Sequence, residues 1–304
     1  MNFLSANDIS KEEIERIFEI ADSFVAGKQT ASIKEHTVLA MYFEKPSTRT
    51  RLSFEVGMTQ LGGRAVFIDS KTSQASKGES YADTARMLSN YCDFVAARLN
   101  RNTDLIEMAN NSEVPVINAM TDIEHPTQGL SDLYTIRSHV KSLKNTRIAF
   151  LGDIQNNTFN SLMVLAAKYG AEIVLIGPQG YLPKSKYVTK VKEYSKVVVT
   201  DSLEDGLDGA DVVYTDSFIS LADTFGQVDL NEVDKRRKLF APYQLNQKTL
   251  ELASKKAIVM HPLPAHRGEE ITSDVLDGPS SVAVEQARNK LLLIKALVLY
   301  LSQH

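Results

Sequence analysis

The stretch TVLAMYFEKPSTRTRLSFE, residues 37–55, predicts a β-strand that runs directly into an α-helix. The strand is closed by Pro46, which cannot continue a hydrogen-bonded ladder. Ser47 suits the N-cap of the helix, and the pair Gly62-Gly63 suits its end. Apolar residues recur at helical spacing between them: Phe54, Met58 and Leu61. A strand followed at once by a helix favours an α/β fold.

The first turn of this predicted helix, residues 47–50, has the composition of an anion site. The N–H groups of residues 48–50 have no partner within the helix, and the positive end of the helix dipole adds to them. Arg49 contributes a full charge and a fork of donors. The motif alone leaves a second interpretation open, a capped surface helix whose arginines are solvated.

The composition limits the class of protein. A chain of 304 residues is long enough for two domains, each with its own core. Its 34 basic and 38 acidic residues give a net charge of −4, so a broad electrostatic surface for nucleic acid is not expected. No apolar run reaches the roughly 18 residues that span a membrane. We therefore expect neither a nucleic-acid partner nor a membrane partner.

Cysteine content and the first residues indicate the compartment. The single cysteine, Cys92, excludes an intramolecular disulfide framework and a cysteine-rich metal site. The first residues, Met1-Asn2-Phe3, do not open a signal peptide. These features predict a protein of the reducing cytoplasm, and we expect neither a metal nor another cofactor.

Strands and helices alternate along both halves of the chain. Apolar segments that predict strands are residues 37–46, 64–69, 93–99, 114–118, 147–153, 171–177, 196–200, 210–216 and 257–264. Amphipathic segments predict helices, the first over residues 9–26 behind a capping box of Ser10 and Glu13. This order predicts an α/β fold of two domains, each a mainly parallel sheet flanked by helices. Residues 141–146 are the expected hinge between the halves.

Polar residues follow several predicted strands in both halves, which is where open α/β sheets bind ligands. A cleft between the two domains is therefore the expected site. A dinucleotide is not the expected ligand, because GDIQNN, residues 152–157, offers one glycine where the dinucleotide-binding turn needs three. Residues 70–80 are polar and without apolar periodicity, and they predict a loop long enough to reach away from its own domain.

Three motifs in this order resemble the transcarbamoylase family of aspartate and ornithine carbamoyltransferases: FEKPSTRTRLSFE at residues 43–55, HPTQ at 125–128 and HPLPAHRGEEI at 261–271. The resemblance extends from Leu39 to the last helix. It implies a carbamoyl phosphate-binding domain over residues 1–140 and an amino-acid-binding domain over residues 141–304. It also implies that the C-terminal helix, residues 283–304, packs back on the first domain and that the Leu263-Pro264 peptide is cis.

The resemblance further implies which residues bind carbamoyl phosphate. The matching positions are Ser47, Thr48, Arg49, Thr50, Gln74, Lys77, Arg98, His125, Gln128, Leu263 and Lys290. The implied catalytic residues among them are Arg49, Thr50, Arg98, His125 and Gln128. Gln128 would hold the carbamoyl amide, while the other four would donate hydrogen bonds to the carbonyl oxygen as an amine attacks. Lys290 stands where the family has an arginine, so the charge is kept and the bidentate fork is lost.

Taken singly, two of these residues have simpler interpretations. His125 before a proline is typical of a helix start, and Arg98 near a strand end is typical of an ion pair. The convergence of five donors is what favours catalysis. A non-catalytic homologue that keeps the fold is the alternative from another class of protein.

The expected acceptor amine is that of ornithine, which would give citrulline and phosphate, a step of arginine metabolism. Asn157 and Asp216 match the ornithine enzymes, whereas the aspartate enzymes have an arginine at each of these places. A negative Asp216 favours a cationic substrate, since an anion facing it would be repelled. The implied amino-acid-binding residues are Asn157, Asp216, Ser220, Leu221, Pro262 and Leu263.

Two departures from the ornithine enzymes keep other acceptors open. Pro262 replaces a cysteine and matches the aspartate enzymes, and Ser220-Leu221-Ala222 replaces Ser-Met-Gly. Aspartate, putrescine and lysine are therefore alternative acceptors.

The loop of residues 70–80 predicts the oligomeric state through the same resemblance. In transcarbamoylases this loop reaches into the phosphate site of the adjacent subunit, and Gln74 and Lys77 match its contact residues. A homotrimer, or a multiple of one, with shared active sites is expected. The other expected partners are small molecules, carbamoyl phosphate and an amino acid. A solvated surface loop is the simpler interpretation of the segment.

Overall fold

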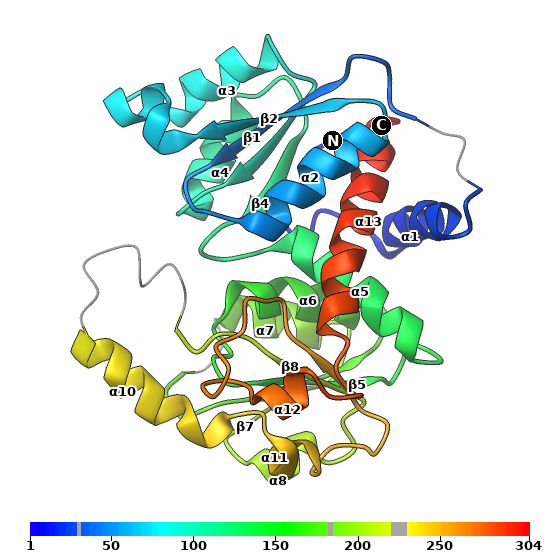
Figure 1. Cartoon of the computed structure of the whole chain (residues 1–304), viewed down its shortest axis with the longest axis vertical. Helices are drawn as coiled ribbons and strands as arrows, with labels where there is room; N and C mark the ends of the chain where they lie inside the picture. The colour runs from blue at the N-terminus through cyan, green and yellow to red at the C-terminus, as the bar shows by residue number, and fades with distance from the viewer. Residues whose placement is uncertain (29–31, 182–184, 220–229) are drawn as a thin grey trace. The chain divides into compact units, whose positions relative to one another are not determined.

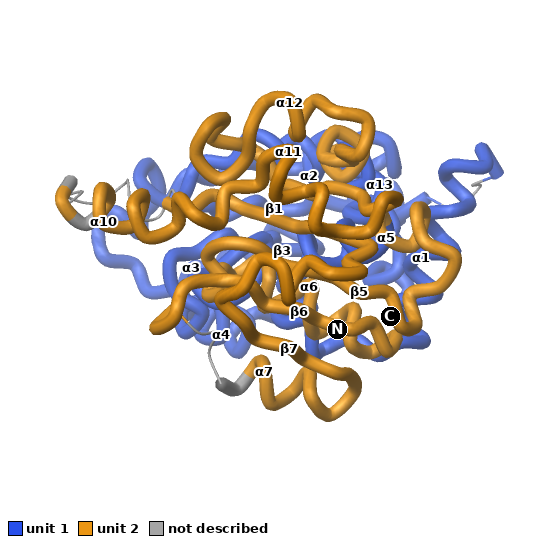
Figure 2. Tube along the Cα trace, turned by 90° about the horizontal axis from the view of Figure 1, so that it is seen from below, with its two compact units in different colours: residues 1–134, 288–304 blue, residues 135–287 orange. Residues whose placement is uncertain are grey.

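The computed structural model describes residues 1–28, 32–181, 185–219 and 230–304. Two of the predicted amino-acid-binding residues, Ser220 and Leu221, lie outside these ranges. The chain forms two compact units, which Figure 2 marks by colour. Unit 1 comprises Met1–Tyr134 and Arg288–His304, and unit 2 comprises Thr135–Ala287.

Unit 1 contains a four-stranded parallel sheet in the order β2-β1-β3-β4. Its strands are β1 (Val38–Phe43), β2 (Arg64–Asp69), β3 (Phe94–Arg98) and β4 (Val116–Met120). At the carboxyl edge, the last residue of β1, Phe43, pairs with the last residue of β3, Arg98. Residues that follow these two strands therefore emerge side by side at one edge of the sheet.

Helices cover both faces of this sheet (Figure 1). They are α1 (Lys11–Val25), α2 (Thr48–Gln60), α3 (Tyr81–Ser89), α4 (Asn102–Asn110), the first part of α5 (Pro126–His139) and the later part of α13 (Ala283–Leu301). Alternate sheet residues such as Tyr42 and Val95 pack with Leu88 of α3 and Leu105 of α4 in one buried cluster. The other face is covered by α2 and α13. The prediction that the C-terminal helix packs on the first domain is confirmed.

Gly57 allows α2 and α13 to approach each other closely. A Cβ at position 57 would lie 3.2 Å from Lys295 Cγ and 3.7 Å from Leu291 Cδ1, both on α13. A side chain there would have to displace its neighbours, because protein interiors are close-packed. The glycine thus fixes a short distance between the two helices.

The local signals at helix ends act as predicted. Ser47 Oγ accepts a hydrogen bond from the Thr50 N–H (3.3 Å) and caps α2, whose turn ends at Gly62 with a φ of 88°. At α1, Ser10 and Glu13 form the predicted capping box.

Unit 2 contains a five-stranded parallel sheet in the order β7-β6-β5-β8-β9. Its strands are β5 (Arg147–Leu151), β6 (Glu172–Ile176), β7 (Val197–Thr200), β8 (Val212–Thr215) and β9 (Ile258–Met260). The helices of this unit are α6 (Asn157–Ala167), α7 (Ser185–Lys192), α8 (Leu203–Leu207), α10 (Leu230–Phe240), α11 (Gln247–Leu250) and α12 (Ser273–Leu276). Two parallel sheets flanked by helices confirm the predicted fold class.

The structure differs from the expectations at three places. The compact units divide at Tyr134/Thr135, inside α5, whereas the expected boundary between residues 140 and 141 falls just after the end of that helix at His139. The predicted loop of residues 70–80 instead forms two 3₁₀ helices, η1 (Ser70–Thr72) and η2 (Gln74–Lys77). The last strand ends at Met260, because the residues that follow turn away from the ladder.

Candidate active site

The carboxyl edge of unit 1 places α2 beside the end of β3. Arg98, the last residue of β3, has 8% of its surface exposed, and its carbonyl accepts a hydrogen bond from the Glu44 N–H (2.9 Å). Burial and, secondarily, the charge of Arg49 lower the pKa of Arg98 to about 10. Arg98 Nε has no hydrogen-bond partner among the described residues. Two guanidinium groups therefore repel each other in a partly dry site, which an anion would relieve.

The motif HPTQ brings a third and a fourth polar group to this edge. His125 directly precedes α5 and is buried, with Nδ1 lying 3.3 Å from Thr127 Oγ1. Gln128 Nε2 donates to Asp132 Oδ1 (2.7 Å), which fixes the orientation of the amide. Because the amino end of the amide is held by Asp132, the Oε1 atom is the end available to a donor.

Lys290 of α13 supplies that donor. Its side chain is 4% exposed, and Nζ donates to Gln128 Oε1 (2.8 Å) and Thr50 Oγ1 (2.9 Å) and lies 3.3 Å from His125 Nε2. Four predicted carbamoyl phosphate residues thereby contact one another directly, although Lys290 follows Thr50 by 240 positions.

Burial and the neighbouring charges shift the pKa values of this group. Burial, followed by the charges of Lys290 and Arg98, holds the pKa of His125 well below its ordinary value, so the imidazole is neutral at pH 7. Burial lowers the pKa of Lys290 to about 7; the charges of Arg98 and Arg49 act in the same direction, and Asp132 opposes them. We call Arg49, Arg98 and Lys290 the cation cluster. Its composition suits a ligand with two negative charges.

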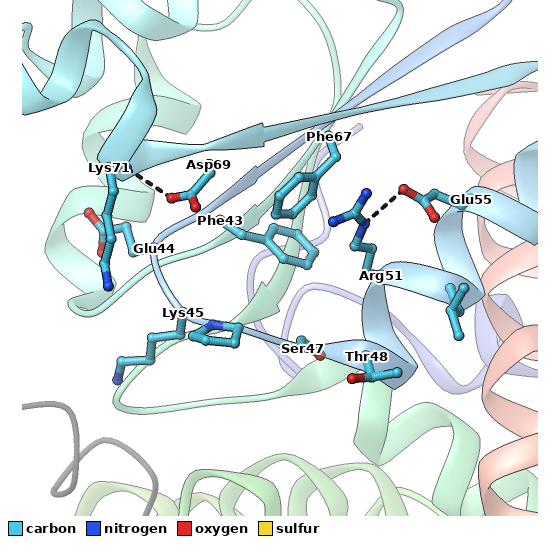
Figure 3. Close-up of a pocket in the computed structure, with 12 residues that line it drawn as sticks. Phe43, Glu44, Lys45, Ser47, Thr48, Arg51, Glu55, Phe67, Asp69 and Lys71 are labelled. Atoms are coloured by element: carbon cyan, nitrogen blue, oxygen red, sulfur yellow. Dashed lines mark hydrogen bonds and ion pairs between the residues drawn. The ribbon is translucent and has the colours of Figure 1, made fainter.

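The remaining predicted carbamoyl phosphate residues of unit 1 do not contact Lys290 through any hydrogen bond described above. Gln74 and Lys77 are exposed on η2, and the described partners of Lys290 do not include them. Ser47 and Thr48, at the head of α2, line a pocket of about 560 Å³ that opens between α2 and β2 (Figure 3).

Figure 3 shows the interior of this pocket. The Arg51 guanidinium stacks over the Phe67 ring, 3.8 Å from its centroid, and Arg51 Nε donates to Glu55 Oε1 (2.8 Å). The pocket is otherwise lined by Phe43, Glu44, Lys45, Pro46, Leu52, Asp69 and Lys71.

In unit 2, polar residues follow β5, β8 and β9, which are neighbours in the sheet. Asn156 caps α6 by accepting from the Thr158 N–H (2.8 Å), and predicted residue Asn157 is the first residue of that helix. Asp216 follows β8 in a partly buried position, where its carboxylate accepts from the Ser217 N–H (2.7 Å). Burial raises the pKa of Asp216, whereas His261, the Ser217 N–H and the Asn156 side chain lower it.

The turn after β9 carries Pro262 and Leu263 and is held by a buried histidine. The Leu263 N–H donates to His261 Nδ1 (2.9 Å), so the ring proton is on Nε2, which lies 3.0 Å from Glu270 Oε1. Leu263 has a φ of 57°, and the Leu263-Pro264 peptide is cis, as predicted.

Sequence reasoning missed several residues that hold these side chains. They are Asp132, Glu270, Gln286 and Arg236. Arg236 binds Asp153 Oδ2 (2.5 Å) and the Phe218 carbonyl (3.1 Å), and thereby connects α10 to the ends of β5 and β8. Asp132 could have been found, because it lies one helical turn after Gln128. Arg236 and Gln286 contact residues far along the chain and have no local signal, whereas Glu270 lies in the same motif as His261, nine residues after it.

The structure defines a two-unit parallel α/β protein whose first unit buries Arg98 and Lys290 beside His125 and Gln128. Comparison with known proteins identifies the class: residues 1–138 match the carbamoyl-P binding domain of aspartate/ornithine carbamoyltransferases, and residues 144–301 match their Asp/Orn binding domain. The chain belongs to the aspartate/ornithine carbamoyltransferase family.

Individual relatives match the chain over its whole length. An ornithine carbamoyltransferase of Methanobrevibacter smithii is 42% identical over 302 residues, covering 98% of each chain. One from Pyrobaculum islandicum is 41% identical over 309 residues, covering 99% of each. The solved ornithine carbamoyltransferase of Pyrococcus furiosus has a TM-score of 0.91 at 38% identity, covering 98% of this chain and 95% of that one. No helix within the described ranges is long and apolar enough to cross a membrane.

Proposed function

We propose that the chain transfers the carbamoyl group from carbamoyl phosphate to the side-chain amine of ornithine, giving citrulline and phosphate. The observation that carries the proposal is the buried group of Thr50, His125, Gln128 and Lys290 beside Arg49 and Arg98. A protein that only kept the fold would not need a concentration of cations that costs stability.

The donors divide between the two ends of carbamoyl phosphate. The phosphate group would bind the N–H groups at the start of α2 and the guanidinium groups of Arg49 and Arg98. The carbonyl oxygen would accept from Thr50 and the neutral imidazole of His125. The carbamoyl NH₂ would donate to Gln128 Oε1, the end of the amide that Asp132 leaves available.

In the chemical step, the neutral amine of ornithine attacks the carbamoyl carbon. A C–N bond forms, the C–O bond to phosphate breaks, and the electron pair leaves with phosphate while the attacking nitrogen loses a proton. The charge that develops on the carbonyl oxygen is what Thr50, Arg98 and His125 stabilise. Holding both reactants in one site supplies a further part of the rate.

The residues of unit 2 support ornithine as the acceptor. The Asn157 amide can donate to the α-carboxylate, and Asp216 can accept from the α-ammonium group. Aspartate would bring a second carboxylate toward Asp216, and an ionised Asp216 would repel it. Pro262 favours aspartate as the second candidate, because it matches the aspartate enzymes. Similarity to ornithine carbamoyltransferases along the whole chain supports the first.

An assay of the full chain with four acceptors tests this proposal. Carbamoyl transfer to ornithine, aspartate, putrescine and lysine is measured as formation of the ureido product, with carbamoyl phosphate saturating. The expected result is a kcat/KM for ornithine at least about a hundredfold above the others. A higher value for aspartate would overturn the acceptor assignment, and no transfer to any acceptor would favour the non-catalytic alternative.

We further propose a homotrimer, or a multiple of one, in which Gln74 and Lys77 of one chain complete the site of its neighbour. Both side chains are exposed, and neither is a partner of Lys290 in its own chain. Ser47 and Thr48 line the pocket of Figure 3, so a second chain could reach the start of α2 through this pocket.

Hybrid oligomers test the shared site. An Arg49→Ala chain and a Gln74→Ala/Lys77→Ala chain are each expected to be inactive, and mixed oligomers should regain activity, since one site can take its helix and its η2 segment from different parents. Hybrids that form by mass spectrometry and stay inactive would contradict the proposal. The single cysteine supports a cytoplasmic location.

A further inference from the structure

The three contacts of Lys290 Nζ are compatible with either a charged ammonium group or a neutral amine. A charged ammonium has three N–H donors, and three acceptors surround it: Gln128 Oε1, Thr50 Oγ1 and His125 Nε2. A neutral amine has two N–H donors and one lone pair, so one of the three contacts must then run in the opposite direction.

Two neighbours could donate a hydrogen bond to a neutral Lys290 amine: His125 and Thr50. Gln128 Oε1 cannot donate, whereas His125 Nε2–H and the Thr50 hydroxyl can. A charged Lys290 requires His125 Nε2 to be an acceptor, which puts the ring proton on Nδ1, 3.3 Å from Thr127 Oγ1. A neutral Lys290 is compatible with a proton on Nε2. A charged Lys290 therefore fixes the tautomer of His125, whereas a neutral Lys290 permits His125 Nε2 to carry the proton and to donate.

The groups that face Lys290 disfavour its charge. They come from every element packed against it: Arg49 from α2, Arg98 from β3, His125 before α5, and Asp132 from α5. Only Asp132 is acidic, and Gln128 lies between it and the lysine. The side chain is buried, and burial lowers its pKa to about 7. An arginine in this place would remain charged throughout the physiological range.

We propose that Lys290 couples the binding of carbamoyl phosphate to the uptake of a proton, and that the coupled movement releases Gln128 and His125 toward the carbamoyl group. The inference rests on the proposed function. The arriving phosphate dianion supplies the opposite charge that the cation cluster needs, so the amine of Lys290 takes a proton from solvent and becomes an ammonium ion. The ammonium then donates to a phosphate oxygen, and Gln128 Oε1 and His125 Nε2 exchange the lysine for the carbamoyl NH₂ and carbonyl groups.

The pH dependence of binding follows by linkage. Above pH 7, an increasing fraction of the unliganded protein must be protonated for the anion to bind, so the apparent Kd should rise about tenfold for each pH unit. Below pH 7 the protonation of Lys290 should no longer change the apparent Kd. Replacement of Lys290 by arginine should abolish the rise of the apparent Kd above pH 7.

Calorimetry with phosphonoacetamide, a stable analogue of carbamoyl phosphate, tests the proposal. Binding is measured in buffers of different ionisation enthalpy at about pH 6 and about pH 8.5, and the number of protons exchanged is obtained at each pH. The comparison uses wild type, Lys290→Arg and Lys295→Arg. Lys295 is the matched control, because it lies on the same helix over the Phe24 ring and outside the cation cluster.

At the higher pH, wild type and Lys295→Arg should take up close to one proton more than Lys290→Arg, and at the lower pH the three should agree to within about 0.2 protons. Equal uptake by Lys290→Arg and wild type at the higher pH would overturn the inference while leaving carbamoyl transfer intact. Failure of wild type to bind phosphonoacetamide at either pH would count against the proposed function itself.

A second measurement needs only the wild-type protein, in case the bulk of the guanidinium group disturbs the packing. In protein labelled with ¹³C at lysine Cε, one signal should titrate near pH 7 without ligand and above about pH 9 when phosphonoacetamide saturates the site. Lysine signals that all titrate above about pH 9 in the unliganded protein would overturn the inference.

Discussion

Unit 1 gathers cations at the edge of its sheet, whereas unit 2 gathers the carboxyl groups of Asp153, Asp216 and Glu270 at its own. Each acidic group of unit 2 has a partner within the unit: Asp153 pairs with Arg236, Glu270 accepts from the His261 ring, and Asp216 accepts from the Ser217 N–H. In unit 1, Lys290 is held by three neutral acceptors, and Arg98 is repelled by a second guanidinium.

Burial disfavours the charged form of the buried group in both units, and it shifts the two pKa values in opposite directions. It raises the pKa of Asp216 and lowers that of Lys290 to about 7. The difference indicates that the carboxyl groups of unit 2 have hydrogen-bond partners within their own unit, whereas the mutually repelling cations of unit 1 suit an anionic ligand. The following changes test this contrast, from the largest expected effect to the smallest.

Arg49→Ala should lower kcat/KM by on the order of a hundredfold or more, because it removes both a phosphate donor and a charge near the developing oxyanion. Steady-state kinetics with both substrates varied measures the loss. Arg64→Ala, at an exposed arginine at the start of β2, is the control and should retain wild-type kinetics. Near-normal turnover of the Arg49 variant would contradict its assignment to the anion site.

Asp216→Asn should raise the KM for ornithine by on the order of tenfold or more, since a charge-assisted hydrogen bond to the α-ammonium is lost. The Kd for phosphonoacetamide should stay within about twofold of wild type, because the anion site lies in the other unit. Equal losses for both ligands would mean that the division of labour between the units is wrong.

Lys290→Met should change how stability depends on pH. The pKa of Lys290 is about 7 in the folded chain against an ordinary 10.5, so the unfolded chain binds more protons between these pH values. The free energy of unfolding of wild type should therefore rise with pH relative to the variant across this window, by up to about 1.4 kcal/mol per unit. Below pH 7 the difference should be constant.

Urea denaturation from pH 6.5 to about pH 9.5 measures this dependence. Lys256→Met, which removes an exposed lysine of unit 2, is the matched control. A difference between wild type and Lys290→Met that does not vary with pH would refute the neutral lysine.

The caps of the two site helices provide the smallest effect. Ser47→Ala and Asn156→Ala should each lower the free energy of unfolding by about 1 kcal/mol, because each removes the acceptor of an N-terminal N–H group. The kinetic effects should separate: Ser47→Ala should raise the KM for carbamoyl phosphate and Asn156→Ala that for ornithine. The opposite pattern would contradict the assignment of the two units.

The sequence predicted those features whose signals are local. The α2 helix, its cap at Ser47 and the capping box of α1 follow from residues three or four positions apart. The parallel pairing in both sheets follows from the alternation of strands and helices, although the order of the strands was not predicted. Resemblance to the family brought together Thr50, His125, Gln128 and Lys290, which composition and periodicity could not do.

Other features depend on contacts between distant segments. The role of Arg236 depends on such packing, and no spacing rule predicts it. His261 and Glu270 lie within one motif, but a spacing of nine residues across irregular backbone does not indicate that they pair. Residues 70–80 were misjudged for a local reason. Asp69 accepts from the Lys71 N–H and Ser73 Oγ from the Ala75 N–H, so short polar side chains start the two 3₁₀ turns without any apolar period.

Gly57 has a consequence for the size of the residue that can occupy position 290. By holding α2 against α13, it sets the gap that the side chain of residue 290 has to span to reach Thr50. A lysine spans that gap as a single flexible chain, whereas a guanidinium adds width as well as length. A change at position 290 therefore has to fit the helix spacing that Gly57 allows through its contacts with Leu291 and Lys295. An arginine at position 290 with the native helix spacing would require smaller side chains around it. Gly57 cannot supply this space, because it has no side chain that could be shortened.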